Sequence, residues 1–421
     1  MNIKIGKRQL QGDVTIPASK SDVHRLLIAA ALADAPTEIL FQGYSEDIDA
    51  TIRCIQELGA KVNRIEHGVQ VIPIVKNEET ALLDCGESGS TLRFLLPIAA
   101  ALGKNTWIEG KGRLPERPIS VITQTLREHG CTVSDDCLPL ELSGKLLGGK
   151  FVLPANISSQ FLTGFLFALP LLEQDSEMVL TTEIESKGYL DMTLDTLQTF
   201  GIKIQQTENR FFVSGKQQYH TPKQIQADGD WSNASFWLAA GAMINAITCH
   251  GLQQYSKQGD KAIADILQQF GAEIHITENA VTVKAKPLKC CRIDAAQIPD
   301  MVPILCMVAA VAEGKTEIYH AGRLRIKESD RLAAMADVLQ KFGVTVEEYP
   351  DGICIYGGNR KQTETEININ GHHDHRIVMA ATIGAMAMQQ NIVIEGAEAV
   401  AKSYPNFFAE FVKLGGDADV L

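Results

Sequence analysis

The sequence lacks several features that would assign it to a broad class of proteins. Its nine cysteines are an odd number and form no C-x-x-C pair, which argues against a disulfide framework or a structural zinc site. Basic residues are scarce, since 39 Lys and Arg stand against 51 Asp and Glu and leave a net charge of −12. A nucleic-acid-binding face needs an excess of positive charge, so this balance argues against such a partner.

Long apolar runs and targeting segments are also missing. The longest apolar runs, near 161–172 and 377–388, are shorter than the roughly 20 residues that a membrane-spanning helix needs. The first residues, MNIKIGKRQLQGDV, alternate like a strand and show neither the apolar centre of a signal peptide nor the composition of a transit peptide. We therefore expect a cytoplasmic protein with reduced thiols and no membrane partner.

What the chain does contain is a repeat. Six amphipathic segments each end in a glycine followed by an alternating strand, and these glycines are spaced 70 to 72 residues apart. Fixed-period similarity of this kind indicates one structural unit repeated along the chain. The glycines suit left-handed C-caps of six helices: Gly59, Gly130, Gly201, Gly271, Gly343 and Gly415.

A second, almost wholly apolar helix is expected in each repeat. These segments begin near Pro17, Ser88, Ser158, Trp231, Asp300 and Asp374. A unit with one buried and one half-buried helix, plus strands, must pack against copies of itself. Six α/β units divide most simply into two pseudo-symmetric lobes of three, with the polar stretch 215–230 as the linker and a cleft between the lobes.

The loops before the apolar helices are dense in hydroxyls and charges. Each loop alone fits a capped helix with solvated charges, but their number favours ligand binding. A helix N-terminus favours anions, and two carboxylates, Asp300 and Glu328, lie in equivalent loops among the cations. This pattern predicts a site for one or two small, multiply anionic molecules, with carboxylates suited to acid–base catalysis. The cations concerned are Lys20, Arg25, Arg117, Arg331, Arg376 and Lys402.

One loop, 371–376, contains three histidines and an aspartate and suggests a metal site at first sight. Successive residues cannot all point at one ion, however, so an anion at Arg376 is the better interpretation. We therefore expect no metal at this loop.

The ordered motifs P-A-S-K-S…R, G-x-S-G-S-T-x-R, R-x-x-E-R-P, S-S-Q-F-L-T, I-P-D, K-E-S-D-R, D-H-R and A-K-S-Y-P-N-F-F resemble those of the EPSP synthase family. The resemblance runs from Lys20 to Phe408. It implies an inverse α/β barrel of two lobes, each with three βαβαββ repeats, covering 1–18 plus 228–421 and 19–227, with the site between them. The implied reaction transfers the enolpyruvyl group of phosphoenolpyruvate to the 5-hydroxyl of shikimate 3-phosphate, on the route to chorismate and the aromatic amino acids.

The resemblance also implies roles for individual residues. Asp300 would be the base, and Glu328 would protonate the methylene carbon with help from Lys20. The ligands of shikimate 3-phosphate would be Lys20, Ser21, Arg25, Ser158, Ser159, Gln160, Ser186, Asp300 and Lys327. The ligands of phosphoenolpyruvate would be Lys20, Gly89, Arg117, Gln160, Arg331, Arg376 and Lys402. The resemblance implies no metal and no organic cofactor. The two small molecules would be the partners of a monomer, with no nucleic acid and no membrane.

Two alternatives remain at this point. The sister enolpyruvyl transferase, which acts on UDP-N-acetylglucosamine, carries a Lys-Asn pair in the first loop and a catalytic cysteine in a mobile loop. This chain has Lys20-Ser21 instead, and no cysteine between Arg113 and Arg117. A non-enzymatic repeat scaffold would not gather cations and carboxylates at its helix starts.

Overall fold

The computed structural model describes residues 1–6, 8–75, 79–361, 363 and 365–421. The chain folds as two compact units, each of which is described on its own. The central unit comprises Lys20–Ala227, and the terminal unit combines Met1–Ser19 with Asp228–Leu421. Within the described part of the chain, no helix is long and apolar enough to cross a membrane.

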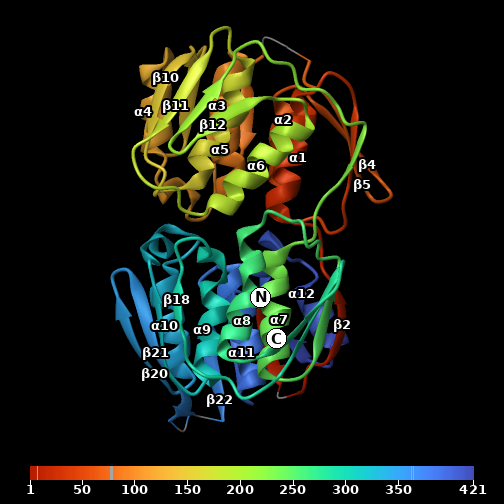
Figure 1. Cartoon of the computed structure of the whole chain (residues 1–421), viewed down its shortest axis with the longest axis vertical. Helices are drawn as coiled ribbons and strands as arrows, with labels where there is room; N and C mark the ends of the chain where they lie inside the picture. Colours follow the sequence, from red (N-terminus) through yellow and green to blue (C-terminus); the bar gives the residue numbers. More distant parts are fainter. Residues whose placement is uncertain (7, 76–78, 362, 364) are drawn as a thin grey trace. The chain divides into compact units, whose positions relative to one another are not determined.

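The central unit contains three four-stranded sheets of one design (Figure 1). In each sheet the first two strands run parallel, and the remaining neighbours are antiparallel. In sheet order, the strands are β14 (Gln224–Gln226), β3 (Thr37–Leu40), β5 (Gly68–Ile72) and β4 (Lys61–Ile65); β6 (Ala81–Asp84), β7 (Thr106–Glu109), β9 (Leu140–Gly144) and β8 (Cys131–Val133); and β10 (Gly149–Leu153), β11 (Ser176–Leu180), β13 (Arg210–Val213) and β12 (Ile204–Thr207).

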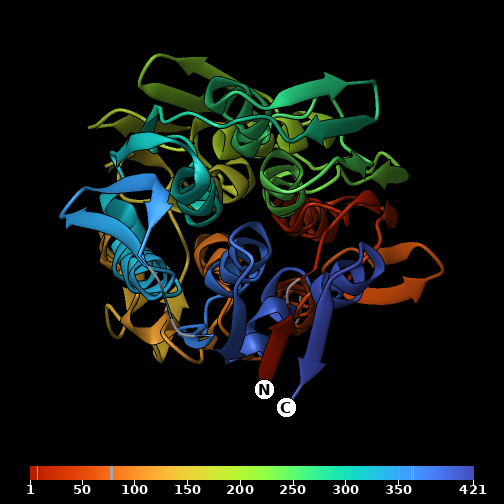
Figure 2. The ribbon, with the colours of Figure 1, turned by 90° about the horizontal axis from the view of Figure 1, so that it is seen from below.

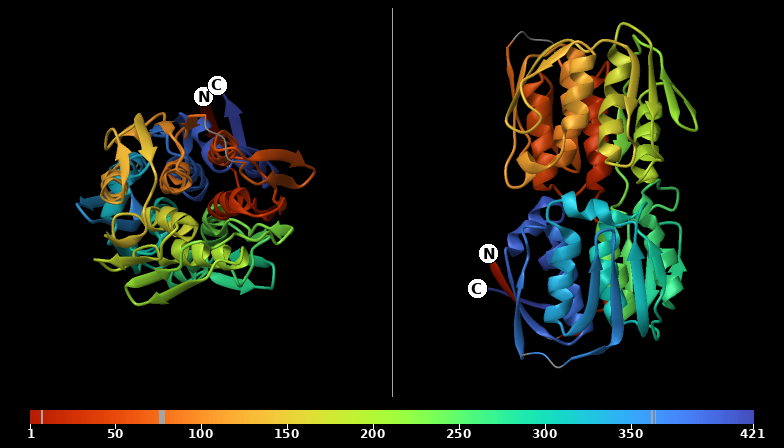
Figure 3. Two further views of the ribbon diagram at one scale, coloured as in Figure 1. Left: turned by 90° about the horizontal axis from the view of Figure 1, so that it is seen from above. Right: turned by 90° about the vertical axis from the view of Figure 1, so that its left-hand side faces the viewer.

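Each of these sheets is accompanied by a buried helix and a more amphipathic one. The buried helices are almost wholly apolar because they lie inside the unit, with the sheets outside them, as the left view of Figure 3 shows. The helices are α1 (Lys20–Leu32), α2 (Glu46–Glu57), α3 (Gly89–Leu102), α4 (Ser120–Glu128), α5 (Ser159–Ala168) and α6 (Lys187–Thr199), with short 3-10 turns η1 (Leu114–Glu116) and η2 (Leu169–Leu171).

The terminal unit repeats the design three more times (Figure 2). Its sheets are β22 (Glu366–Asn370), β23 (Asn391–Glu395), β1 (Asn2–Gly6) and β24 (Asp417–Val420); β16 (Glu273–Ile276), β17 (Ala280–Lys284), β15 (Ile247–His250) and β2 (Gly12–Thr15); and β18 (Arg292–Asp294), β19 (Gly314–Tyr319), β21 (Gly352–Arg360) and β20 (Val344–Tyr349).

The helices of the terminal unit follow the same alternation. Helices α7, α9 and α11 are buried and pack against one another at the centre of the unit. The helices are α7 (Trp231–Met243), α8 (Ile263–Phe270), α9 (Val302–Val311), α10 (Arg331–Lys341), α11 (His375–Ala387) and α12 (Phe407–Lys413), with 3-10 turns η3 (Gly259–Ala262), η4 (Pro299–Met301), η5 (Gly322–Ile326) and η6 (Ala397–Lys402).

The six-fold repeat predicted from the glycine spacing is confirmed by the backbone. All six glycines have φ between 79° and 111°, the left-handed region that ends a helix at little cost only for glycine. The predicted α/β class with repeated strand–helix units is likewise confirmed by the six sheets.

The polar stretch 215–230 is only partly the linker that its composition suggested. It contains β14, which pairs in parallel with β3 and so completes a sheet of the central unit. The chain leaves that unit at Ala227, and the next residues join the terminal unit: Ser19 donates its N–H to the Asp228 carbonyl at 2.7 Å, and Asp230 donates to the carbonyl of Pro17 at 2.9 Å.

Candidate active site

In the central unit, two helix starts are capped by the serines that the sequence indicated. The Ser88 hydroxyl accepts the N–H of Thr91 at 3.2 Å, and the Ser158 hydroxyl accepts the N–H of Gln160 at 3.3 Å. Helix α1 differs, because Ser21 lies inside its first turn and only Ser19 stands in the cap position. Capped N-termini present unpaired N–H groups and a partial positive charge, which suit anionic ligands.

Two arginine side chains lie close to Gly89 at the start of α3. A Cβ atom added to Gly89 would lie 2.6 Å from Nη1 of Arg93 and 2.9 Å from Nη1 of Arg117. The two guanidinium groups therefore lie directly against the first turn of the helix. This places two full positive charges beside the partial charge of the helix N-terminus, as an anion site requires.

Gln160 connects the starts of α3 and α5. Its Oε1 accepts from Nη1 of Arg93 at 2.9 Å, and its Nε2 donates to the hydroxyl of Ser90 at 2.9 Å. Arg93 was not among the predicted ligands, although the S-G-S-T-x-R motif contains it. The contact fixes the Gln160 side chain beside the Gly89 turn and adds Arg93 to the set of site residues.

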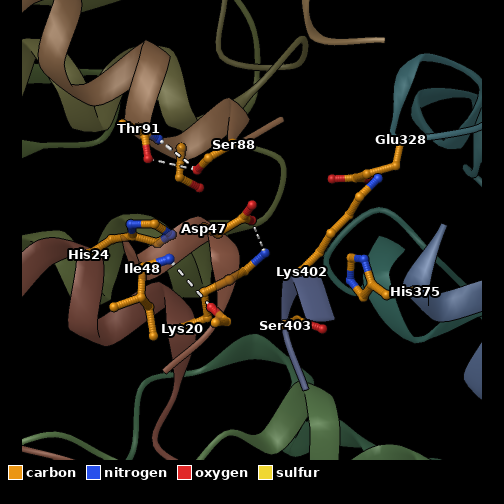
Figure 4. Close-up of polar contacts among 12 residues, drawn as sticks. Lys20, His24, Asp47, Ile48, Ser88, Thr91, Glu328, His375, Lys402 and Ser403 are labelled. Carbon is orange, nitrogen blue, oxygen red and sulfur yellow. Dashed lines mark hydrogen bonds and ion pairs between the residues drawn. The ribbon is translucent and has the colours of Figure 1, made fainter. Parts of the chain in front are cut away.

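The first helix contributes Lys20, Ser21 and Arg25. The Lys20 ammonium donates to Asp47 at 2.6 Å (Figure 4). The buried Arg25 guanidinium donates from Nε to Thr193 at 2.9 Å and from Nη2 to the carbonyl of Tyr189 at 2.8 Å. Burial lowers the pKa of Arg25 to about 10, so this guanidinium stays charged at neutral pH.

Ser186, another predicted ligand, precedes helix α6. It is buried and has φ of 55° and ψ of 48°, an uncommon left-handed conformation for a residue with a Cβ. Such local strain is found most often at ligand sites, where the surrounding structure holds it. The role of Ser186 in ligand binding stays a prediction.

In the terminal unit, Arg331 stands at the centre of a buried ion-pair network. Its side chain is 1% exposed and contacts three carboxylates. Nη1 donates to Asp300 at 2.8 Å, Nη2 to Glu328 at 2.8 Å, and Nε to Asp374 at 2.8 Å. Burial opposes the charge, but the three carboxylates, Asp374 above all, raise the pKa of Arg331.

Asp300 is surrounded by two further cations. Nζ of Lys327 and Nη2 of Arg376 each lie 3.5 Å from its carboxylate oxygens. Burial alone would raise the pKa of this carboxyl, but the neighbouring cations, Arg376 first among them, hold it well below its usual range. Asp300 is therefore an ionised hydrogen-bond acceptor at neutral pH, encircled by groups that attract anions.

Lys402, another predicted ligand, contacts the loop before α11. Nζ of Lys402 donates to the His373 carbonyl at 2.6 Å, and the lysine is buried at the end of η6. Glu328, His375 and Lys402 are labelled in Figure 4. Among the described residues, no group of three or more His, Cys, Asp or Glu side chains has an arrangement that could hold a metal ion.

The predicted site residues thus fall into two sets. The structure brings Gly89, Arg117 and Gln160 together through Arg93, and places Lys20, Ser21 and Arg25 on the first two turns of α1. It brings Asp300, Lys327, Glu328, Arg331 and Arg376 together around one carboxylate–guanidinium network. Ser158 and Ser159 lie at the start of α5, Ser186 before α6 and Lys402 at the end of η6.

Three acidic residues of the two units were missed by the sequence analysis or predicted only as helix caps. Asp374 caps α11 through the N–H of Arg376, yet it is also the fully buried partner of Arg331. Asp47 stands in the first turn of α2, where an acidic residue is ordinary, so nothing in the sequence marked it as the partner of Lys20. Asp260, in η3, is buried near Asp300.

The buried carboxyl of Asp260 should make the stability of the protein depend on pH. Burial, and then the charge of Asp300, raise its pKa from 3.8 to about 6. Since the native state binds the proton more tightly than the unfolded chain, the contribution of Asp260 to stability falls as pH rises from about 4 to about 6. Asp260→Asn removes this loss, and should be more stabilising at pH 7.5 than at pH 4 by about 2 kcal/mol. Urea denaturation of both proteins at the two pH values measures the difference; an equal effect at both would contradict the raised pKa.

Comparison with known proteins identifies the class to which this fold belongs. A solved structure described as EPSP synthase from Acinetobacter baumannii matches with a TM-score of 0.81, 26% sequence identity and full coverage of both chains. A structure described as the enolpyruvyl transferase NikO from Streptomyces tendae matches with a TM-score of 0.78 at 15% identity, covering 99% of this chain and 98% of that one, which shows the fold alone. The architecture is that of the enolpyruvyl transferases.

Sequence comparison narrows the class. The family model described as EPSP synthase (3-phosphoshikimate 1-carboxyvinyltransferase) matches residues 4–411. Proteins named 3-phosphoshikimate 1-carboxyvinyltransferase from Clostridium beijerinckii and Clostridium acetobutylicum are 41% and 42% identical over 99% of this chain and cover 98% and 97% of their own length. The chain belongs to the EPSP synthase family, as its motifs predicted, and the alternative of the sister transferase is not favoured.

Proposed function

We propose that this protein transfers the enolpyruvyl group of phosphoenolpyruvate to the 5-hydroxyl of shikimate 3-phosphate, releasing phosphate. The observation that carries the proposal is the Asp300 carboxylate, held ionised by Lys327, Arg331 and Arg376. It is a proton acceptor placed among cations that can bind phosphate and carboxylate groups. Membership of the family supports the same activity.

The binding roles follow the two sets of residues. Shikimate 3-phosphate would contact Lys20, Ser21, Arg25, Ser158, Ser159, Gln160, Ser186, Asp300 and Lys327. Phosphoenolpyruvate would contact Lys20, Gly89, Arg117, Gln160, Arg331, Arg376 and Lys402. Both substrates carry several negative charges, and the cations offset the repulsion between them. Holding two reactants in place in this way can lower a barrier by about 7–11 kcal/mol.

The reaction would proceed by addition followed by elimination. Asp300 accepts the proton of the 5-hydroxyl as that oxygen bonds to C2 of phosphoenolpyruvate, and Glu328, assisted by Lys20, gives a proton to the methylene carbon. The product of addition is a tetrahedral intermediate. The new methyl group then returns a proton to the Glu328 carboxylate as the bond from C2 to the phosphate oxygen breaks, which restores the double bond. The leaving phosphate takes up the proton held by Asp300, and the cations stabilise the charge on it.

Three finer features stay predictions. Both sets of residues must act on one pair of substrates, so we propose that the active site forms between the two units. The protein should act as a monomer in the cytoplasm. A sedimentation-velocity experiment on the whole chain tests the oligomeric state directly.

A phosphate-release assay tests the activity. We expect phosphate from phosphoenolpyruvate only when shikimate 3-phosphate is present, in equal amount to the enolpyruvyl product seen by mass spectrometry. UDP-N-acetylglucosamine in place of shikimate 3-phosphate should give none. Release with the nucleotide sugar and none with shikimate 3-phosphate would replace this function by that of the sister transferase.

Thiol chemistry should be dispensable. Burial raises the pKa of Cys131 to about 11, and a hydrogen bond to Asp135 raises the pKa of Cys137, so both are protonated, weakly nucleophilic thiols at neutral pH. Cys131→Ser and Cys137→Ser should therefore keep kcat within about twofold of the unaltered protein. A folded variant without turnover would point to a cysteine-dependent mechanism.

A further inference from the structure

A chain of buried hydrogen bonds links the substrate-binding starts of α1 and α3 through α2. His24 contacts the Thr51 hydroxyl through Nδ1 at 2.6 Å, and Thr51 contacts the hydroxyl of Thr91 at 2.6 Å. Thr91 in turn donates to the cap hydroxyl of Ser88 at 2.7 Å. Figure 4 shows the Ser88–Thr91 end of this chain. All four residues are fully buried, with exposed fractions of 0%.

The chain is one of two parallel connections between α1 and α2. Lys20 and His24 lie one turn apart on α1, and their partners Asp47 and Thr51 lie one turn apart on α2. Residues four apart share one face of a helix, so the ion pair and the hydrogen bond hold the same two faces together. The second connection continues to α3 through Thr91.

The directions of the other hydrogen bonds follow from the donation of Thr91 to Ser88. Thr91 uses its only hydroxyl proton toward Ser88, so Thr51 must donate to Thr91, and the Nδ1–H of His24 must donate to Thr51. Burial, reinforced by the charges of Lys20 and Arg25, lowers the pKa of His24 well below 6.5. A neutral imidazole with its proton on Nδ1 meets both conditions.

We propose that His24 is a positioning residue, which acts through Thr51 and Thr91 to hold the Ser88 cap and the Gly89 turn in the geometry that binds phosphoenolpyruvate. The proposal rests on the function proposed above. Gly89 follows Ser88 directly, and Arg93 and Arg117 lie against it. Cutting the link at His24 or Thr51 removes one partner of the Thr51 or Thr91 hydroxyl and loosens the hold of α2 on the first turn of α3, although the bonds from Thr91 to Ser88 remain. The phosphoenolpyruvate side of the reaction should suffer most.

The test uses variants that cut the chain at two points. Thr51→Val replaces the middle hydroxyl by a methyl of the same shape, and His24→Leu removes the donor. Each should raise the KM for phosphoenolpyruvate about tenfold, which equals about 1.4 kcal/mol of binding. The KM for shikimate 3-phosphate and kcat should each change less than about threefold. Two rescue variants, Thr51→Ser and His24→Asn, keep a hydroxyl or an N–H donor in place and should recover most of the affinity.

The matched control is Thr196→Val in α6, a buried threonine of the same unit. Its hydroxyl donates only to the carbonyl of Met192 in its own helix, among the contacts seen. It should leave both KM values unchanged. Melting temperatures of all variants verify folding, and Thr51→Val remains informative if His24→Leu does not fold.

The kinetic results distinguish a failure of the proposed function from a failure of the role inferred for His24. An unaltered protein that releases no phosphate would refute the proposed function rather than the role of His24. An active protein whose folded Thr51→Val variant keeps the original KM for phosphoenolpyruvate would overturn the inference. So would an equal rise in both KM values, or rescue variants as impaired as the variants they are meant to restore, because these results indicate a merely structural role.

Discussion

Asp300→Asn should lower kcat by about 10²–10⁴-fold, the usual contribution of a positioned acid or base. The change removes the proton acceptor but leaves Lys327, Arg331 and Arg376 in place with less negative charge to offset them. The variant should therefore bind the anionic substrates as tightly as the unaltered protein, or more tightly. Steady-state kinetics together with calorimetric titration of shikimate 3-phosphate separates the two effects.

Glu328→Gln should give a loss of turnover of the same order, since the amide cannot supply a proton to the methylene carbon. Its partner Arg331 would retain Asp300 and Asp374. Asp294→Asn is the control for both substitutions, because this exposed aspartate of the same unit pairs with His320 at the surface. Near-normal turnover in either site variant would remove that residue from the mechanism.

Arg331→Met should cost about 3–5 kcal/mol in the free energy of unfolding, because it leaves buried carboxylates without their cation. Asp374 is the most affected, since it is fully buried and Arg331 is its ion-pair partner at 2.8 Å. Urea denaturation followed by tryptophan fluorescence reports on this unit, in which Trp231 and Trp237 are fully buried. The variant should also lose affinity for phosphoenolpyruvate.

Two controls make the Arg331 result specific. Arg292→Met breaks an exposed pair with Glu317 and should cost only about 0–1 kcal/mol. Adding Asp374→Asn to Arg331→Met should recover part of the lost stability, because it removes the unpaired charge rather than restoring the pair. A cost for Arg331→Met no larger than that of Arg292→Met would mean that the network contributes little.

Much of the fold could be predicted because its signals are local and repeated. The helix-ending glycines, such as Gly59 and Gly343, combine an amphipathic pattern with a conformation that favours one residue type. Six occurrences at one period made the repeat visible without any knowledge of tertiary contacts. Strand β14 was missed because three residues within a polar stretch carry no pattern, and its sheet forms only by pairing with a strand about 186 residues away.

The candidate site could be predicted where a motif stands at a helix start, and not where a partner arrives from elsewhere. Gly89 and Arg331 lie in such motifs. Asp47 and Thr51 lie on an ordinary amphipathic helix, and their roles become apparent only from their contacts with side chains of α1. Composition and spacing cannot predict such pairings, because the pairings depend on how whole helices pack.

The placement of β1 and β2 has a consequence for synthesis on the ribosome. Both strands belong to sheets whose other members come from the far part of the chain: β1 lies between β23 and β24, and β2 pairs with β15. The central unit, by contrast, is one uninterrupted segment that is complete when Ala227 emerges. At about 5–20 residues per second, the remaining part of the chain takes roughly 10–40 s to appear. Strand β2 can pair as soon as β15 appears, but β1 has no partner in its sheet until β23 emerges. We therefore expect the central unit to fold first and the incomplete terminal unit to be the more aggregation-sensitive part of the growing chain.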